Sequence, residues 1–463
     1  MATAVWIKQS QGLANRIDPA RIQYNPKTGV VNYSEAYNVN FDITGAFSRR
    51  KGFSVTDIST SCHSLFDAGS TALFVSDTKL YTLTSGLVAT SIRTNLTLNL
   101  PMSFCQVGGM ILYMNGAQSG VIEAGVSYAL VKPDNPRYPD TTRVYSDPPV
   151  GTIVRAFSGR IYIAEGSVLW YSDPFAPNLF RLSTNYIPFP ADIIMVAPVI
   201  GGIFVSTTKK IYFLAGKDAK QFQQSVVAHY PAIEGTDCEV DGIAVNGGKI
   251  SPVPVQIFTT TMGICVGTAD GQLVNLTFED LDIPTVTRGC AVYTGKKYIV
   301  SFVTEEYALC MNLGNAASSE FGNYNFNGLC KFGDMLLGGN ENGLFKLDAG
   351  DTDGEDKISA WIRTGPTDFG AEEEKRLRKI YVSYRTDGRM KMSVSGDGKE
   401  EITQDIIASN VDLDMIHQKV PGGRDIRGKY LDMKLENVEG ADFLVNEVKA
   451  VLVVLGANTV EGS

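Results

Sequence analysis

The stretch Gln11–Phe53 reads QGLANRIDPARIQYNPKTGVVNYSEAYNVNFDITGAFSRRKGF and sets the first expectation for the fold. From Tyr37 to Ile43 the odd-numbered residues are apolar or aromatic, and the even-numbered residues are Asn or Asp. A period of two is typical of a strand with one buried face and one exposed face. Thr44-Gly45 interrupts the pattern, and the chain returns through residues 46–52. The sequence therefore predicts a β-hairpin with a glycine in its turn and a cationic end.

The cationic end is the pair Arg49-Arg50, for which two interpretations are open. In the first, both arginines are solvated at a strand end, where a charge contributes little to stability. In the second, they pair with an acidic loop of the same subunit or of a neighbouring one, which makes them candidate interface residues. An isolated hairpin is marginal in water. We therefore expect residues 1–63 to pack on the domain that follows, a propeller, or to supply strands to it.

Length and composition favour a large β protein. The chain has 463 residues, enough for two or more domains or one large ring of repeats. It is rich in Gly, Tyr and Phe, and long helical patterns are hard to find. The net charge of −9 and the pI near 5.1 argue against wrapping duplex DNA through phosphate contacts. They are compatible with DNA that passes by an acidic wall, which repels it.

The first residues, MATAVWIKQSQ, lack the apolar core of a signal peptide, and no apolar run has the length of a membrane helix. We therefore expect synthesis in a cytoplasm. The number of cysteines is seven, which is odd, and no pair has the CxxC spacing. The sequence predicts buried, reduced thiols.

One sequence pattern recurs between residues 64 and 350. An apolar strand is followed by a short polar turn and a second strand, and a glycine often ends the unit, as in Leu73–Gly86 and Gly202–Gly216. Seven copies begin roughly 35 to 60 residues apart, a spacing typical of propeller blades. Blades bury their faces by packing side by side around an axis. The pattern therefore predicts a β-propeller of about seven blades over 64–350.

Two segments are interpreted as loop insertions in this propeller. Residues 132–149 are proline-rich and polar, and residues 221–254 carry several acidic residues. Long loops in a compact repeat usually make contacts. The interface candidates from these loops are Tyr138, Arg143, Asp237 and Glu239.

The composition changes near Asp348. Residues 348–357 form an acidic, glycine-bearing segment that partly matches a calcium loop through Asp351, Asp353 and Gly354. Ala349 and Ala360 stand where the first ligand and the closing glutamate belong, so we interpret the segment as a solvated linker. Residues 351–463 show alternating strands, for example Lys379–Tyr384 and Phe443–Val453, and predict a β-sandwich-like domain. The expected fold class is all-β, a propeller followed by this domain.

Two groups of residues resemble one known family, the tail nozzle or tail hub proteins of short-tailed bacteriophages, of the tail tubular protein B class. The first group is the hairpin: the Asn-rich strand, Gly45, Ser48-Arg49-Arg50 and Gly52. The second lies in the C-terminal domain: Thr364-Gly365, Asp368-Phe369-Gly370, Lys375-Arg376-Leu377-Arg378, Arg427-Gly428, Tyr430, Glu436-Asn437, Gly440-Ala441-Asp442-Phe443 and Val445. The propeller between them resembles the family in architecture only.

The resemblance implies a structural virion protein. Its subunits form a ring, expected to be a homohexamer, which docks below the head-to-tail adaptor and near the tail fibres or spikes. The ring retains the packaged genome and forms the channel for DNA ejection, without sequence-specific DNA binding. The expected location is the virion tail, after synthesis and assembly in the cytoplasm of the host bacterium.

No catalytic motif accompanies these features, so the sequence predicts no enzyme, no cofactor and no metal site. The three histidines are far apart, and the HExxH, GxSxG, GxGxxG and P-loop patterns are missing. Paired carboxylates near loops, such as Asp173, Glu165, Asp237 and Glu239, leave one alternative open. That alternative is a propeller tail spike or surface protein that binds or hydrolyses glycan. A cellular propeller scaffold is a weaker third interpretation.

Overall fold

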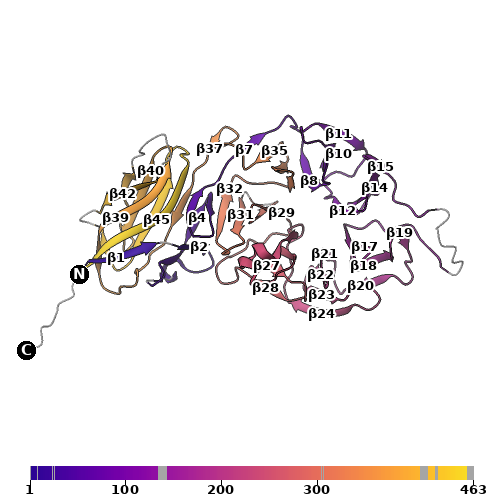
Figure 1. Ribbon diagram of the computed structural model, residues 1–463, viewed down its shortest axis with the longest axis horizontal. Helices are drawn as coiled ribbons and strands as arrows, with labels where there is room; N and C mark the ends of the chain where they lie inside the picture. The colour runs from indigo at the N-terminus through magenta and orange to yellow at the C-terminus, as the bar shows by residue number, and fades with distance from the viewer. Residues whose placement is uncertain are drawn as a thin grey trace, which may run out of the picture.

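The computed structural model describes residues 2–7, 9–22, 24–25, 27–133, 143–303, 305, 307–406, 415–422 and 426–455. In these residues the regular structure is β, apart from three short 3-10 helices. The helices are η1 (Pro19–Arg21), η2 (Gly242–Ala244) and η3 (Asn246–Gly248). A ring of small sheets forms one end of the molecule, and a pair of larger sheets forms the other (Figure 1).

The ring is a β-propeller with seven blades in the described part of the chain. Blade 1 contains β8 (Cys62–Asp67), β9 (Ala72–Ser76), β10 (Lys79–Leu83) and β11 (Ala89–Arg93). Blade 2 contains β12 (Ser103–Val107), β13 (Met110–Met114), β14 (Ser119–Glu123) and β15 (Val126–Tyr128). Blade 3 is β16 (Ile153–Phe157), β17 (Arg160–Glu165), β18 (Val168–Asp173), β19 (Ala176–Phe180), with β20 (Tyr186–Pro188) paired to β18. Blade 4 contains β21 (Ile193–Val199), β22 (Gly202–Thr207), β23 (Ile211–Ala215) and β24 (Gln223–Ala228). Blade 5 contains β25 (Cys238–Val240), β26 (Val255–Thr260), β27 (Gly263–Gly267) and β28 (Leu273–Asn275). Blade 6 is β29 (Gly289–Thr294), β30 (Lys297–Phe302), β31 (Tyr307–Asn312), β32 (Ser318–Gly322).

Blade 7 combines strands from distant parts of the sequence. Three strands, β33 (Gly328–Phe332), β34 (Met335–Asn340) and β35 (Gly343–Leu347), follow blade 6, and the fourth is β7 (Phe53–Val55). Phe53 pairs with Leu347, and Val55 pairs with Phe345. The end of the Gln11–Phe53 stretch thus closes the propeller ring.

The inner strands of the blades are buried on both faces. Every residue of β9, β22 and β26 is buried. Because each blade packs between two others, these strands appear in the sequence as continuous apolar runs instead of alternating ones. The runs are the recurring sequence pattern, and the predicted fold class, a propeller followed by a sandwich-like domain, is confirmed.

The C-terminal domain is a pair of packed sheets. The first contains β1 (Ala2–Ile7), β5 (Val39–Phe41), β6 (Phe47–Arg49), β39 (Lys375–Thr386), β42 (Ile416–Pro421), β43 (Arg427–Gly428) and β45 (Phe443–Val454). The second contains β2 (Gln9–Leu13), β3 (Val30–Tyr33), β4 (Glu35–Tyr37), β38 (Trp361–Arg363), β40 (Met390–Gly396), β41 (Ile402–Ile406) and β44 (Leu431–Asn437). This second sheet continues into blade 6, because β4 pairs with both β38 and β32. One sheet therefore runs from the propeller into the C-terminal domain.

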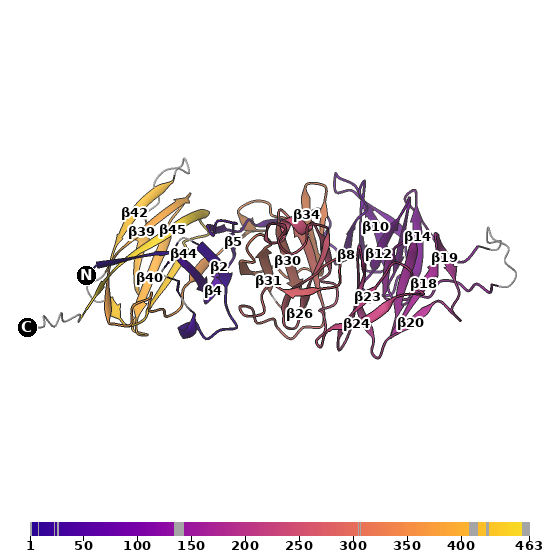
Figure 2. The same cartoon turned by 60° about the horizontal axis from the view of Figure 1, so that its bottom comes forward.

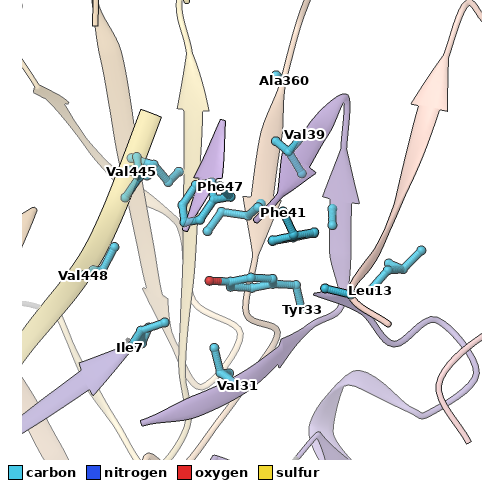
Figure 3. Close-up of a cluster of buried hydrophobic side chains, with 14 of the residues drawn as sticks. Ile7, Leu13, Val31, Tyr33, Val39, Phe41, Phe47, Ala360, Val445 and Val448 are labelled. Carbon is cyan, nitrogen blue, oxygen red and sulfur yellow. The ribbon is translucent and has the colours of Figure 1, made fainter. Parts of the chain in front are cut away.

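In the N-terminal segment, residues 1–63, strands β2, β4 and β5 lie between the two halves of the molecule (Figure 2). Its side chains share one core with the C-terminal domain, in which Tyr33, Phe41 and Phe47 meet Val445 and Val448 (Figure 3). The predicted hairpin is β5–β6, with Gly45 in the left-handed region at φ 88°. The hairpin itself pairs with β45 of the C-terminal domain, whereas β4 and β7 of the same N-terminal region pair with β32 and β35 of the propeller. Residues 1–63 therefore supply strands to the propeller, as expected, and also to the C-terminal domain.

Two features differ from the sequence prediction: the position of Ile43 and the structure of segment 221–254. Ile43 is 64% exposed, because Asp42 Oδ1 accepts hydrogen bonds from the Thr44 and Ala46 amides and ends the strand at Phe41. The segment 221–254 is not a loop insertion, because it contains β24 and β25. Most of β24 is exposed, and its first three residues are polar, so the sequence does not show the alternation of a half-buried strand.

Candidate functional site

The junction between propeller and C-terminal domain contains a buried arginine, Arg50. Its side chain is 2% exposed and forms a double ion pair with Asp353, at 2.7 Å from Nη1 to Oδ1 and 2.5 Å from Nη2 to Oδ2. Nε donates to Asn38 Oδ1 at 2.8 Å. Nη1 and Nη2 also donate to the Lys51 and Gly322 carbonyls. A guanidinium has five N–H donors, so every donor of Arg50 is used.

Two aromatic rings complete the surroundings of Arg50. The Phe321 and Tyr324 rings lie with their centres 5.6 Å from its guanidinium carbon. Burial raises the pKa of Tyr324, so this ring stays neutral beside the ion pair. Breaking a buried ion pair of this kind from one side typically costs about 3–5 kcal/mol.

Asn38 connects three segments at this point. Its backbone is left-handed, with φ at 54°, which ends β4 and starts β5 in a different sheet. Its Oδ1 accepts from Arg50 and from the Gly322 amide, and its Nδ2 donates to the Ser359 carbonyl at 2.8 Å. Asn tolerates a positive φ better than most residues. The second residue of the predicted strand is therefore the point where the chain passes from one sheet to the other.

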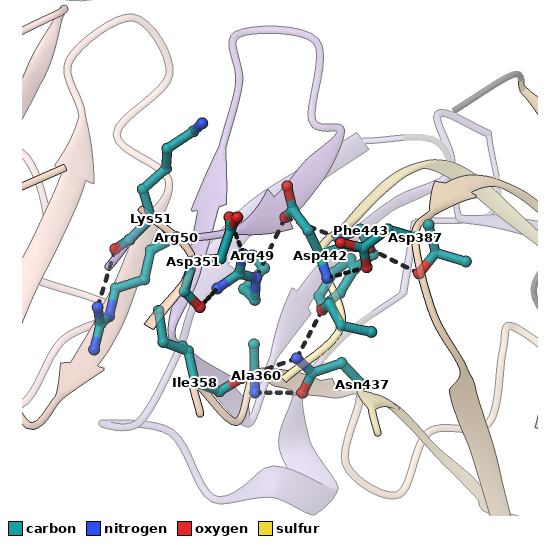
Figure 4. Close-up of polar contacts among 12 residues, drawn as sticks. Arg49, Arg50, Lys51, Asp351, Ile358, Ala360, Asp387, Asn437, Asp442 and Phe443 are labelled. Atoms are coloured by element: carbon teal, nitrogen blue, oxygen red, sulfur yellow. Dashed lines mark hydrogen bonds and ion pairs between the residues drawn. The ribbon is translucent and has the colours of Figure 1, made fainter. Parts of the chain in front are cut away.

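Arg49 makes a second, more exposed set of contacts. Its Nη2 lies 2.9 Å from Asp351 Oδ1, and its Nε lies 3.3 Å from Asp442 Oδ1 (Figure 4). The Arg49 side chain is 1% exposed, whereas those of Asp351 and Asp442 are 71% and 40% exposed. Nη1 also donates to the Asp351 carbonyl at 2.8 Å. Arg49 thus joins the hairpin, the acidic segment and the start of β45.

These contacts decide between the interpretations of Arg49-Arg50. The solvated interpretation is wrong, because the acidic segment 348–357 of the same chain supplies Asp351 and Asp353. The segment is not simply a solvated linker either, since it folds into β36 (Thr352–Asp353) and β37 (Asp356–Lys357), and Asp353 is buried. Both carboxylates of the partial calcium pattern face guanidinium groups. The described residues contain no cluster of His, Cys, Asp and Glu that could hold a metal ion.

A second polar cluster, centred on Arg363, lies in the sheet shared by blade 6 and the C-terminal domain. Arg363 contacts Asp432 at 2.7 Å, Glu401 at 2.9 Å and Glu35 at 3.7 Å. Burial raises the pKa of Asp432, and the Arg363 charge opposes that rise. Asp432 Oδ1 has no hydrogen-bond partner among the described residues. The cluster could not be seen in the sequence, because Glu35 lies more than 300 residues before the other three members.

Three of the remaining interface candidates, Arg143, Asp237 and Glu239, lie in the described residues, and no ion pair joins them to each other there. Asp237 is bound by Arg155 at 3.0 Å inside the propeller, and Glu239 is exposed on β25. Arg143 lies 3.6 Å from Asp173, and Tyr138 lies outside the described residues. Their role as contacts between subunits stays a prediction.

The carboxylates considered for glycan hydrolysis are held by neighbours. Asp173 accepts hydrogen bonds from Arg181, Asn185 and Tyr145, and Glu165 accepts from the Trp170 indole at 2.9 Å.

All seven cysteines are free; five are buried and two are half-buried, and burial raises the pKa of Cys62 to about 12.

A cleft with a volume of about 980 Å³ lies beside the junction. The β5–β6 hairpin, the β29–β30 turn and the start of β45 line it. Five of its lining side chains are basic: Arg49, Lys51, Lys296, Lys297 and Arg385. The carboxylates of Asp42, Asp241, Asp348 and Asp442 balance most of this charge, so the cleft itself has no strong preference for an ion of one sign.

Comparisons with known proteins identify no family. No protein-family model and no curated protein matches the chain. Among solved structures, the BBS1N domain in a complex with ARL6DN matches at 12% identity and a TM-score of 0.43, over 64% of this chain and 96% of that one. BamB from Moraxella catarrhalis matches at 12% identity and a TM-score of 0.36, over 75% and 97%. The gluconolactonase XC5397 from Xanthomonas campestris matches at 14% identity and a TM-score of 0.35, over 63% and 94%.

These three structures are propeller proteins with different functions, one of them an enzyme. At such low identity and TM-score the matches carry no functional argument. Within the described residues, no helix has both the length and the apolar character needed to span a bilayer.

Proposed function

We propose that the chain is a structural subunit of the tail nozzle or hub of a short-tailed bacteriophage. In this role a ring of subunits, a homohexamer, docks below the head-to-tail adaptor and close to the tail fibres or spikes. The ring retains the packaged genome and forms the channel through which DNA leaves. The protein then acts in the virion tail after assembly in the cytoplasm of the host, and its task is structural instead of catalytic.

One observation carries this proposal: the two groups of residues that resemble the nozzle family meet in space. Arg49 of the first group contacts Asp442 of the second at 3.3 Å, and Phe47 next to it packs edge-on against Phe443. Ser48 pairs with Leu444 across β6 and β45. Nearly 400 residues separate these partners, so the resemblance covers one continuous structural unit.

The form of this unit supports a mechanical role. The buried Arg50–Asp353 pair and the sheet that continues from β32 through β4 to β38 join the two halves of the molecule. A subunit that holds pressurised DNA needs such a stiff connection, because force on one domain must reach the other. The net charge of −9 favours a channel that DNA passes without adhering.

Assembly on the adaptor tests the proposal. Full-length protein is mixed with a portal–adaptor complex from a short-tailed phage, and the particles are imaged by electron microscopy. We expect a ring of six copies below the adaptor. A chain that stays monomeric on this template, or that binds duplex DNA tightly at physiological salt, contradicts the proposal. Release of sugars from bacterial surface polysaccharide would instead support the glycan-hydrolase alternative.

A variant pair sharpens this experiment. Arg50→Met removes the buried ion pair, and Arg21→Met removes an exposed arginine on η1. If the stiff connection matters for docking, Arg50→Met lowers ring occupancy at a temperature where it is still folded, and Arg21→Met does not. Equal occupancy for both variants shows that the connection serves stability only.

A further inference from the structure

The first sheet of the C-terminal domain has an unusual charge distribution. Its seven strands, β1, β5, β6, β39, β42, β43 and β45, contain nine Lys and Arg residues and one carboxylate, Glu447. Lys375 and Arg49 are buried. The other seven are wholly or partly exposed, and we call them the basic face: Arg376, Arg378, Lys379, Arg385, Lys419, Arg427 and Lys449.

Strand register brings the centre of the basic face together. Tyr381 on β39 stands directly opposite Lys419 on β42 and Lys449 on β45. The ammonium groups of Lys379 and Lys449 lie 5.4 and 5.9 Å from the centre of its ring. A hydrogen bond from Lys379, and the charges of all three lysines, lower the pKa of Tyr381. Three cations thus surround one tyrosine on the solvent side of the sheet.

The rest of the chain has the opposite charge. The whole sequence has 41 Lys and Arg against 50 Asp and Glu. With the seven cations of the basic face and Glu447 set aside, 34 basic residues remain against 49 acidic ones. A surface of one sign on a molecule that is otherwise of the other sign favours association with an oppositely charged partner and sets its orientation. Such a partner is present wherever this protein is present, because a second copy carries it.

We propose that the basic face docks onto the acidic surface of a second copy of this chain, so that subunits associate head-to-tail. This contact uses two different patches, which is the interface type that closes into a ring. Most of β39, β42 and β45 stands at the end of the molecule away from the propeller, as a head-to-tail contact requires (Figures 1 and 2). Of the seven cations, Arg385 is the one that lines the junction cleft. The inference rests on the proposed ring function and identifies one of its two contact surfaces.

Two features favour a protein partner over nucleic acid. The cations near the Tyr381 ring leave little room for a base to stack on it. Half-buried aliphatic side chains share the face, since Val451 pairs with Lys379 and Val453 pairs with Arg376. Mixed apolar and charged surfaces are typical of protein interfaces, whereas phosphate-binding surfaces are more polar and more positive.

Charge reversal tests the proposal. The variant Arg378→Glu/Lys419→Glu/Arg427→Glu changes three exposed residues of the basic face. The control Lys209→Glu/Lys217→Glu/Lys249→Glu changes three exposed lysines of the propeller and alters net charge by the same amount. Sedimentation velocity of the full-length proteins at about 50 mM and about 500 mM salt measures self-association, which screening weakens at the higher salt. We expect association of the parent to weaken about tenfold or more in the basic-face variant, and less than about threefold in the control.

Two results would overturn the proposal. The first is a parent that stays monomeric at low salt and at about 100 μM, a concentration that detects even weak contacts. The second is a basic-face variant that self-associates like the parent but loses binding to a DNA duplex of roughly 20 base pairs, which assigns the face to phosphate contacts. Neither result decides the proposed function, which assembly on the adaptor tests separately. Thermal unfolding of each variant confirms that it is folded.

Discussion

The blades and the junction are built from the same kind of strand, but different interactions hold them. Each of blades 1–5 is a separate sheet, and its contacts with the next blade include large clusters of apolar side chains, such as Phe204, Phe213 and Phe258, beside single polar contacts such as Arg160 with Asp218. At the junction the sheet is continuous, and the closest contacts are ionic, with Arg50 and Arg49 bound to Asp353 and Asp351. Apolar packing tolerates exchange of similar residues, whereas a buried ion pair requires one particular partner. The junction should therefore respond more sharply than the blades to single changes.

The largest expected effect is at Arg50. Arg50→Met leaves Asp353 charged and buried without its partner, so unfolding free energy should fall by about 3–5 kcal/mol. Chemical denaturation measures the loss, with Arg21→Met as an exposed control that changes it by less than about 0.5 kcal/mol.

The double variant Arg50→Met/Asp353→Leu distinguishes charge from shape at this site. With both charges removed, no buried charge is left unpaired, so much of the lost stability should return. If the double variant is as unstable as Arg50→Met alone, the shape of the guanidinium and its bonds to Asn38, Lys51 and Gly322 hold the junction instead of the charge pair.

A smaller effect is expected at Gly52, which follows the arginine pair. A Cβ at this position would lie 1.9 Å from the Thr352 carbonyl oxygen, so alanine must push the acidic segment away. Overpacking of this kind costs about 1–3 kcal/mol, measured by the same denaturation. Gly109→Ala in the β12–β13 turn is the matched control, because its Cβ meets nothing within 4 Å. Equal stability of the two variants would show that the acidic segment moves freely.

These residues also show how far sequence reasoning reaches. The blades could be predicted, because a strand buried on both faces needs an apolar run and each run ends in a turn. The hairpin could be predicted from its period of two. The partners of its strands could not, because Asn38 turns the chain from one sheet into another and β45 lies nearly 400 residues further on. β24 was hidden for a related reason: an outer strand of a blade needs no apolar alternation.

The polar sites were predictable only as possibilities. The sequence shows two arginines and an acidic segment, and pairing within the chain was one of two interpretations for them. Which one holds depends on burial, since the same charges are nearly neutral for stability when solvated. The Arg363 cluster left no local signal, because the pairing of β4, β38 and β44 brings Glu35 and Asp432 to Arg363, and β40 and β41 add Glu401.

Acid should weaken the propeller through His63 in blade 1. Burial, with the charge of Arg288 in addition, lowers the pKa of His63 from 6.5 to about 4. The unfolded chain then binds a proton more readily than the folded one, so stability is present above pH 6.5 and falls as the pH drops toward 4. By pH 5 the free energy of unfolding should fall by about 1–2 kcal/mol, after allowance for the partial exposure of His63.

His63→Gln removes this titration and keeps a polar group beside Ser64 Oγ, which lies 2.8 Å from His63 Nδ1. Thermal unfolding of parent and variant between pH 5 and pH 7 measures the difference. The difference in melting temperature between the two proteins should change with pH in this range. A constant gap would mean that His63 is protonated equally in both states.

The smallest expected effect is at Arg49, and it sharpens the comparison with its neighbour. Arg49→Ala removes ion pairs to Asp351 and Asp442, but both carboxylates are well exposed and regain water when the arginine is lost. The cost in unfolding free energy should therefore be about 1 kcal/mol or less, much below that at Arg50, although the two arginines are almost equally buried.

Salt sharpens the distinction, because ions screen the exposed pairs and hardly reach the Arg50–Asp353 pair. Denaturation at low and high salt measures this distinction. The difference in free energy of unfolding between Arg49→Ala and the parent should shrink at high salt, whereas the difference between Arg50→Met and the parent should stay constant. If Arg49→Ala is as damaging as Arg50→Met at both salt concentrations, then burial of the arginine decides its contribution, and exposure of the carboxylate partner does not.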